Sequence, residues 1–182
     1  MKKKLRASYS LLNTWKRGDI NGAVDMYLHR SSYTSIEMEE GKWFHDEWEN
    51  QILQYKEAKI GKTILRFRKP QPEREIIVPY NDIIYLKGRL DCTDRKTIYE
   101  FKTGKTDIMD YVNGYQIPFY FLLTDLANDK MTKCDLIHYN QHTDEGQFFR
   151  IRRSEYMINK AREYIDSIGP DIYYYFESIG IL

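Results

Sequence analysis

Two carboxylates and a lysine stand close together in the middle of the chain, at Asp91, Glu100 and Lys102. Residues 83–91 and 97–102 are predicted to be two strands joined by a polar turn. Side chains alternate along a strand, so Glu100 and Lys102 share one face, and the hairpin can place Asp91 beside Glu100. Two adjacent carboxylates repel each other unless a cation lies between them. Oxygen ligands favour Mg²⁺ or Mn²⁺, and a nearby lysine can hold an attacking water or a phosphate oxygen, so the pattern indicates phosphodiester hydrolysis.

The same residues also have a simpler interpretation. Acidic and basic residues on a hairpin are commonly a solvated face, and a spacing this short occurs by chance in many proteins. His45, inside a predicted helix, is by default a packing or surface residue. The choice between a metal site and a solvated face therefore depends on the rest of the chain.

The composition excludes several classes of protein. The 182 residues are 42% hydrophobic and 30% charged, as expected of one globular domain, 1–182. The net charge of +1 predicts that any nucleic-acid binding must come from local basic patches. There is no apolar run of about 20 residues, no signal-peptide core, and no metal-type spacing of the two cysteines. We therefore expect a cytoplasmic protein.

Residues 1–60 are predicted to be an N-terminal helical region. Its first helix would be capped by Ser8 or Ser10 and end at Gly18, and a second would cover residues 21–29. The longest helical pattern runs from Ile36 to about Ala58 and carries His45.

Residues 61–153 are predicted to form the catalytic sheet with one helix, and residues 154–182 the C-terminal helices. Besides the hairpin, the expected strands cover residues 64–68, 75–78, 134–139 and 147–152. The helix over 109–126 contains Pro118, which either kinks it or marks a late start. A helix from Ser154 should stop at Gly169-Pro170, before a short one over 171–178. This order predicts an α/β fold with one central sheet.

Five blocks of the sequence, taken in order, resemble the RecB-type nucleases of the PD-(D/E)xK superfamily, which include the Cas4 nucleases. The blocks are Ser8-Tyr9-Ser10-Leu11-Leu12, Gly41-x-x-x-His45-x-x-x-Glu49, Gly88-Arg89-Leu90-Asp91, Glu100-Phe101-Lys102-Thr103-Gly104-Lys105, and Gln116-x-x-x-Tyr120. The resemblance implies a restriction-endonuclease-like α/β/α core around a central mixed sheet. It also implies that His45 is a metal ligand.

The roles implied by this resemblance fall on nine positions. The metal ion, Mg²⁺ or Mn²⁺, would be held by the side chains of His45, Asp91 and Glu100 and by the carbonyl oxygen of Phe101. Lys102 would orient the water and stabilise charge on the phosphorus, so the catalytic residues would be Asp91, Glu100 and Lys102. The substrate-binding residues would be Ser10, Lys105, Gln116 and Tyr120. Glu73 or Glu75 matches an acidic position in some relatives.

The chain departs from many Cas4-like members in its cysteines. Those members bind an iron–sulfur cluster through four cysteines, and this chain has only Cys92 and Cys134, so we expect no cluster. It also lacks a P-loop and helicase motifs, which indicates a stand-alone nuclease or a subunit whose motor is another protein.

The function implied is a metal-dependent DNA nuclease, most simply an exonuclease on single-stranded or end-bearing DNA in repair, recombination or phage and mobile-element DNA processing. The alternative is a non-cleaving nucleic-acid-binding or regulatory subunit of a helicase or recombination complex. Two basic clusters interleaved with aromatic residues would track phosphates, unless they are simply solvated faces. They are Lys59, Lys62, Arg66, Arg68, Lys69 and Arg150, Arg152, Arg153, Lys160, Arg162.

Overall fold

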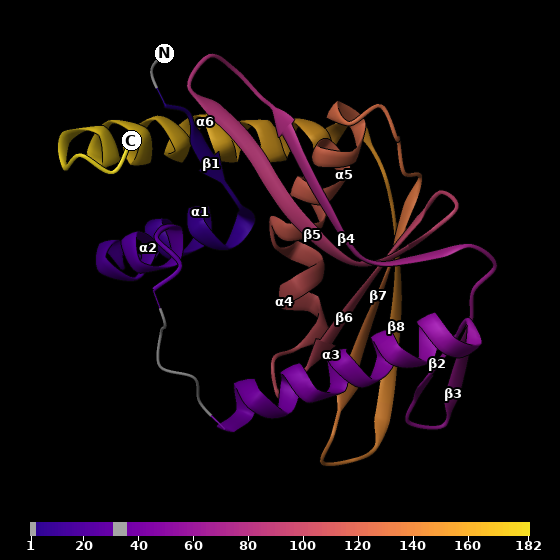
Figure 1. Cartoon of the computed structure of the whole chain (residues 1–182). Coiled ribbons are helices and arrows are strands. Elements are labelled where there is room, and N and C mark those ends of the chain that lie inside the picture. The colour runs from indigo at the N-terminus through magenta and orange to yellow at the C-terminus, as the bar shows by residue number, and fades with distance from the viewer. Residues whose placement is uncertain (1–2, 31–35) are drawn as a thin grey trace.

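The computed structural model describes residues 3–30 and 36–182 (Figure 1). Within these residues a mixed sheet of six strands forms the centre, and helices cover it, as the α/β prediction requires. The strands of this sheet are β1 (Leu5–Ala7), β4 (Pro70–Pro79), β5 (Ile84–Asp94), β6 (Thr97–Thr103), β7 (Lys133–Asn140) and β8 (Glu145–Arg152). In the described residues no helix is both long enough and apolar enough to cross a membrane.

Strand β5 pairs with three other strands, and its two edges are occupied differently. One edge pairs with antiparallel β4 along nearly its whole length. The other edge is shared: parallel β1 pairs with residues 84–86, and antiparallel β6 pairs with residues 92–94. No described strand pairs with residues 87–91 of this edge, and β5 and β6 diverge there (Figure 1).

Helices α5 (Gln116–Leu126) and α6 (Glu155–Ser178) bury one face of the sheet in the main hydrophobic core. A Cβ atom on Gly88 would lie only 2.5 Å from Leu123 Cδ2, so the glycine lets α5 approach β5 closely where β1 and β6 leave the edge open. Helices α1 (Tyr9–Lys16) and α2 (Ile20–Tyr27) extend the same core through residues such as Leu11 and Leu12.

Helix α3 (Ile36–Tyr55) packs against the sheet through a separate, smaller core. Trp48 and Ile52 are buried there against Phe101 and Tyr139, together with the hairpin of β2 (Glu57–Ile60) and β3 (Thr63–Arg66). The indole Nε1 of Trp48 also donates a hydrogen bond to the carbonyl of Lys59 at 3.0 Å. The smaller core therefore fixes the helix that carries His45.

The N-terminal boundaries differ from those expected. The segment 1–60 is not wholly helical, because Leu5–Ala7 forms β1 and the long helix ends at Tyr55, after which Lys56 has a positive φ of 54° and β2 begins. A three-residue strand is too short to show a pattern. Ser8, rather than Ser10, caps α1, since its Oγ accepts the N–H of Leu11 at 3.2 Å.

The prediction of a single helix over 109–126 was wrong, because α4 (Ile108–Asn113) ends at Gly114 and α5 starts at Gln116. Pro118 lies in the first turn of α5, where a helix has no hydrogen bond to lose, which confirms the late start.

The prediction of two C-terminal helices was also wrong, because α6 continues through Pro170. Ile172, Tyr173 and Phe176 beyond the proline are all buried in the main core. Burying three large apolar side chains outweighs the one backbone hydrogen bond that proline removes.

Candidate active site

Asp91 and Glu100 meet at the point where β5 and β6 separate. The last paired residues are Cys92 and Tyr99, one step before both carboxylates. Beyond them, the N–H of Phe101 donates to Asp91 Oδ2 at 2.8 Å, so a carboxylate takes the place of a strand partner. Glu73, on the neighbouring strand β4, has a positive φ of 49°, and the paired register of β4 with β5 skips it. Local backbone distortion thus accompanies the placement of Asp91.

Glu100 is the most deeply buried charged group of the site, with 1% of its side chain exposed. Its Oε1 forms an ion pair with the ammonium of Lys102 at 2.7 Å and accepts a hydrogen bond from the amide N–H of Gln116 at 2.7 Å. Its Oε2 is buried and has no hydrogen-bond partner among the residues that the structure describes. A buried carboxylate oxygen is normally satisfied, so this atom is where a missing cation or donor would act.

Gln116 and Tyr120 connect Glu100 to β5 through a chain of hydrogen bonds. The Gln116 amide also donates to the Tyr120 hydroxyl at 2.9 Å, and that hydroxyl donates to the carbonyl of Arg89 at 3.1 Å. The carbonyl lies on the edge of β5 that has no described strand partner. Helix α5 therefore ties the open edge of β5 to the orientation of Glu100.

Burial and neighbouring charges together set the pKa values of Glu100, Asp91 and Lys102. Burial raises the pKa of Glu100 to about 7, and the nearby Asp91 carboxylate adds to this effect. Burial raises the pKa of Asp91 to about 6, although Lys102 and the Phe101 N–H oppose the change. Burial acts to lower the pKa of Lys102, but Glu100 and Asp91 outweigh it and raise the pKa, so Lys102 is a cation at neutral pH.

His45 reaches the site from α3. Its Nδ1 lies 3.8 Å from Asp91 Oδ2, and a Cβ on Gly41, one turn earlier, would lie 2.8 Å from Thr103 Oγ1 at the end of β6. The glycine thus permits close approach of the helix to the strand. Burial, followed by the charge of Lys102, lowers the pKa of His45, which favours the neutral imidazole that metal ions bind.

The remaining predicted residues lie in different places. Phe101 contributes its N–H to Asp91, and its ring is buried against Trp48. Ser10 lies in a separate cavity near the N-terminus, and Lys105 is exposed in the turn after β6. The structure therefore groups His45, Asp91, Glu100, Phe101, Lys102, Gln116 and Tyr120, and leaves Ser10 and Lys105 outside this group.

An acidic cleft of about 710 Å³ opens in front of Asp91. It is lined by Lys42, His45, Asp46, Glu49, Glu73, Glu75, Arg89 and Asp91. Asp46 was not singled out from the sequence, although its place next to His45 on α3 was a usable signal. Tyr111 was missed as well, and the Lys102 ammonium lies 5.5 Å from the centre of its ring.

No group of three histidine, cysteine, aspartate or glutamate residues in the described chain is arranged closely enough to hold a metal ion as it stands. The donors nevertheless suit one in kind, because two carboxylates and a neutral imidazole are the ligand types that Mg²⁺ and Mn²⁺ accept. The unpartnered Glu100 Oε2 is consistent with a cation bound beside it.

Comparison with protein-family models and with curated proteins finds no match to this sequence. Solved structures do resemble the fold. A putative exonuclease from Eubacterium rectale has a TM-score of 0.63 at 11% identity, over 97% of this chain and 82% of that one. The alkaline exonuclease LHK-Exo from Laribacter hongkongensis has a TM-score of 0.61 at 10% identity, over 96% and 91%. LHK-Exo in complex with dAMP has a TM-score of 0.59 at 11% identity, over 96% and 93%.

At such low identity, these matches establish the fold. The chain has the mixed α/β fold, with a central mixed sheet and covering helices, that is seen in these exonucleases.

Proposed function

We propose that this protein is a divalent-metal-dependent deoxyribonuclease of the PD-(D/E)xK type, acting as an exonuclease on single-stranded or end-bearing DNA. The observation that carries the proposal is the buried Glu100 carboxylate, held by Lys102 and Gln116 beside Asp91, with one oxygen that has no partner in the described part of the chain. Burying charged groups costs stability unless every one is paired, so a purely structural role does not account for this arrangement. The exonuclease neighbours support the same reaction class.

In this proposal His45, Asp91, Glu100 and the carbonyl of Phe101 would hold Mg²⁺ or Mn²⁺. When bound, such an ion polarises the phosphoryl oxygen and lowers the pKa of a bound water. The Glu100 carboxylate now paired with Lys102 would then share its charge with the ion. The proposal includes no iron–sulfur cluster, because the two cysteines, Cys92 and Cys134, cannot supply four ligands.

The protein's own residues supply the rest of the chemistry. Lys102 remains protonated, so it acts as a fixed positive charge that stabilises the developing charge on the phosphate and orients the water. Gln116 fixes the rotamer of Glu100, and Tyr120 fixes Gln116 through its hydroxyl. Because Tyr120 is only 6% exposed, its role is to position Gln116.

The finer assignment is a RecB-type or Cas4-like nuclease that works in the cytoplasm in repair, recombination or phage and mobile-element DNA processing. It is supported by the order of the five sequence blocks and by the grouping of His45, Asp91, Glu100 and Lys102 in space. A helicase or recombination protein would be a natural partner, because unwinding a duplex supplies the single strands on which the proposed exonuclease acts.

The test is degradation of end-labelled single- and double-stranded DNA with Mg²⁺, Mn²⁺ or EDTA. Wild type is compared with Asp91→Ala, Lys102→Ala and, as the matched control, Asp171→Ala, which removes an exposed carboxylate from α6. We expect metal-dependent cleavage that both site variants lose and the control retains, and the product ladder shows whether digestion starts at ends. Cleavage that survives Asp91→Ala and Lys102→Ala would refute the site.

The non-cleaving subunit remains the competing function, because Lys102 already satisfies some of the negative charge of Glu100 without a metal. Folded wild-type protein that binds DNA but cleaves no substrate under any metal condition would favour it.

A further inference from the structure

A second cavity, of about 790 Å³, lies near the N-terminus and has the opposite charge to the acidic cleft. Its lining includes Lys3, Lys4, Arg6, His29 and Lys87, and none of the described residues that line it is acidic. Four permanent cations around one cavity raise each other's energy unless an anion binds among them. The cavity therefore favours an anionic ligand.

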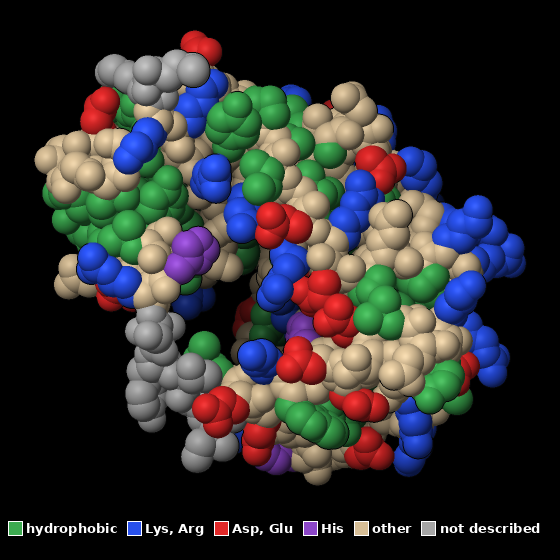
Figure 2. Space-filling view, in the orientation of Figure 1, with side chains coloured by type: hydrophobic (Ala, Val, Ile, Leu, Met, Phe, Trp, Pro, Cys, Tyr) green, Lys and Arg blue, Asp and Glu red, His purple; other side chains and the backbone are tan. Residues whose placement is uncertain are grey.

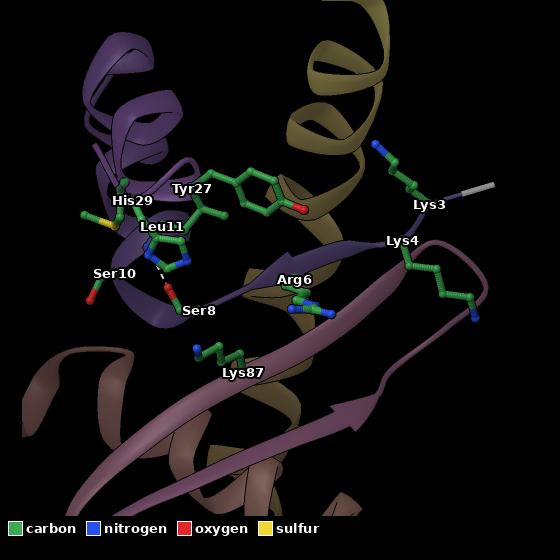
Figure 3. Close-up of a pocket in the computed structure, with 10 residues that line it drawn as sticks. Lys3, Lys4, Arg6, Ser8, Ser10, Leu11, Tyr27, His29 and Lys87 are labelled. Carbon is green, nitrogen blue, oxygen red and sulfur yellow. Dashed lines mark hydrogen bonds between the residues drawn. The ribbon is translucent and has the colours of Figure 1, made fainter. Parts of the chain in front are cut away.

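The fold explains why these side chains converge. Arg6 is exposed between buried Leu5 and Ala7 on β1, and it pairs in register with Tyr85 on β5. Lys87, two residues along β5, lies on the same face as Tyr85. Figure 3 shows Lys87 and Arg6 on neighbouring strands, with Ser8 beside them and His29 across the same space.

The cations of this cavity are only partly neutralised by neighbouring groups. Lys87 contacts Glu75 at 3.2 Å, and Lys4 lies 5.2 Å from the centre of the Tyr85 ring, while Arg6 forms no ion pair with any described residue. In the C-terminal cluster, by contrast, Arg150 is paired with Asp135 and Arg153 with Asp125 and Glu155. Positive charge at the N-terminal cavity therefore remains available to a ligand.

Strand β5 connects this cavity with the acidic cleft. Lys87 lines the basic cavity, Asp91 lines the acidic cleft, and Glu75 of the cleft pairs with Lys87. Asp91 lies four positions along the strand from Lys87, or roughly 13 Å. Figure 2 shows the surface hollowed between the region formed by α1 and α2 and the region formed by α3, with Lys and Arg side chains along the rim.

We propose that the basic cavity binds a phosphate of the nucleic-acid strand, a few nucleotides away from the phosphate that is cleaved. The distance along β5 is too long for one phosphate to contact both Lys87 and Asp91. Binding at the cavity does not require cleavage. The proposal rests on the proposed function only in that the bound strand continues to the cleavage site at Asp91. An internal phosphodiester and a terminal phosphate offer the same chemistry, so the ligand is a strand phosphate of either kind.

The experiment measures binding of a fluorescein-labelled single-stranded oligonucleotide by anisotropy, in EDTA and at several salt concentrations. The test protein is Arg6→Gln/Lys87→Gln. The control is Arg95→Gln/Lys130→Gln, which removes the same charge from exposed positions in the β5–β6 turn and in the loop before β7. Circular dichroism confirms that both variants fold.

We expect the test variant to lose about tenfold or more in affinity for each side chain removed. The slope of log affinity against log salt concentration is negative, and in the test variant it should become shallower by about 1.4, or about 0.7 for each lost contact to a single strand. The control should bind as the wild type does. An unchanged affinity and slope in the test variant, or an equal loss in the control, would overturn the proposal.

Three oligonucleotides separate the two phosphate sources: one with a 5′-phosphate, one with a 3′-phosphate and one with hydroxyl ends. If the cavity holds an end, the test variant loses the extra affinity of one phosphorylated oligonucleotide. If it holds an internal phosphate, the loss is equal for all three. Wild-type protein that binds DNA through this cavity but does not cleave it would refute the nuclease and leave the cavity assigned.

Discussion

Replacing Glu100 by glutamine should make the metal-free protein more stable than wild type at alkaline pH. Burial raises the pKa of this carboxyl from 4.5 to about 7 in the folded protein. Between these two values the folded protein keeps a proton that the unfolded chain has released. The contribution of Glu100 to stability is therefore fully present below about pH 4.5 and is lost as the pH rises through about 7, and glutamine, which cannot ionise, avoids this loss.

The size of the effect follows from the two pKa values. The difference between 4.5 and about 7 corresponds to roughly 3 kcal/mol, at about 1.4 kcal/mol for each pKa unit. Solvent screens little of this free-energy difference, because only 1% of the Glu100 side chain is exposed. For a domain of this size, 1 kcal/mol changes Tm by about 2–4 °C, so the expected gain is roughly 6–12 °C.

The assay is thermal unfolding followed by circular dichroism in EDTA, from about pH 5 to about pH 8, for wild type and Glu100→Gln. Glu163→Gln, on an exposed position of α6, is the control and should follow the wild type. Adding Mn²⁺ at the alkaline end should raise the Tm of wild type more than that of Glu100→Gln, because the ion compensates the buried charge. Parallel pH profiles for wild type and Glu100→Gln would refute the reasoning.

Three further predictions concern the support of the site and the fold. Gln116→Leu removes the amide that holds Glu100 Oε1, so single-turnover cleavage should slow by about 10–100-fold with DNA affinity unchanged; an unchanged rate would contradict the positioning role. Gly88→Ala places a Cβ 2.5 Å from Leu123 Cδ2 and should destabilise the protein by about 1–3 kcal/mol in urea unfolding, whereas a neutral effect would mean that α5 can move away. Ser8→Ala loses the cap of α1 and should cost about 1 kcal/mol in the same assay, while Ser10→Ala, at an exposed position, should cost nothing; equal losses would contradict the cap assignment.

The general α/β architecture was predictable because its strands and helices have clear hydrophobic periods. The hairpin of β5 and β6 was found from residue types and turn signals, and its register follows from the pairing of Cys92 with Tyr99. Pro170 shows the limit of this reasoning. A proline normally ends a helix, and only the tertiary contacts of Tyr173 and Phe176 explain why α6 continues.

The grouping of residues in the candidate site was also partly predictable. His45, Asp91, Glu100 and Lys102 could be named because their residue types match a nuclease pattern. The sequence did not reveal that Gln116 would contact Glu100 directly, because the two residues are brought together by the packing of α5 on β5.

The basic cavity was missed for the same reason. Its residues come from the N-terminus, the end of α2 and the middle of β5, and no local window of sequence contains them together. The expected clusters, in contrast, were contiguous in sequence. Some of their arginines are neutralised by carboxylates from elsewhere in the chain, as Arg150 is by Asp135.

The two separate hydrophobic cores have a consequence for how the site can be dismantled. His45 is carried by α3, which is held by the smaller core around Trp48 and Phe101, whereas Gln116 is carried by α5 in the main core. Cooperative opening of the smaller core exposes less apolar surface than global unfolding, so it requires less free energy. Backbone amides of α3 should therefore exchange with solvent faster than those of α5. Transient detachment of α3 would remove His45 from the site while leaving the Glu100–Gln116 side intact, which gives the molecule a reversible route to inactivation below its melting temperature.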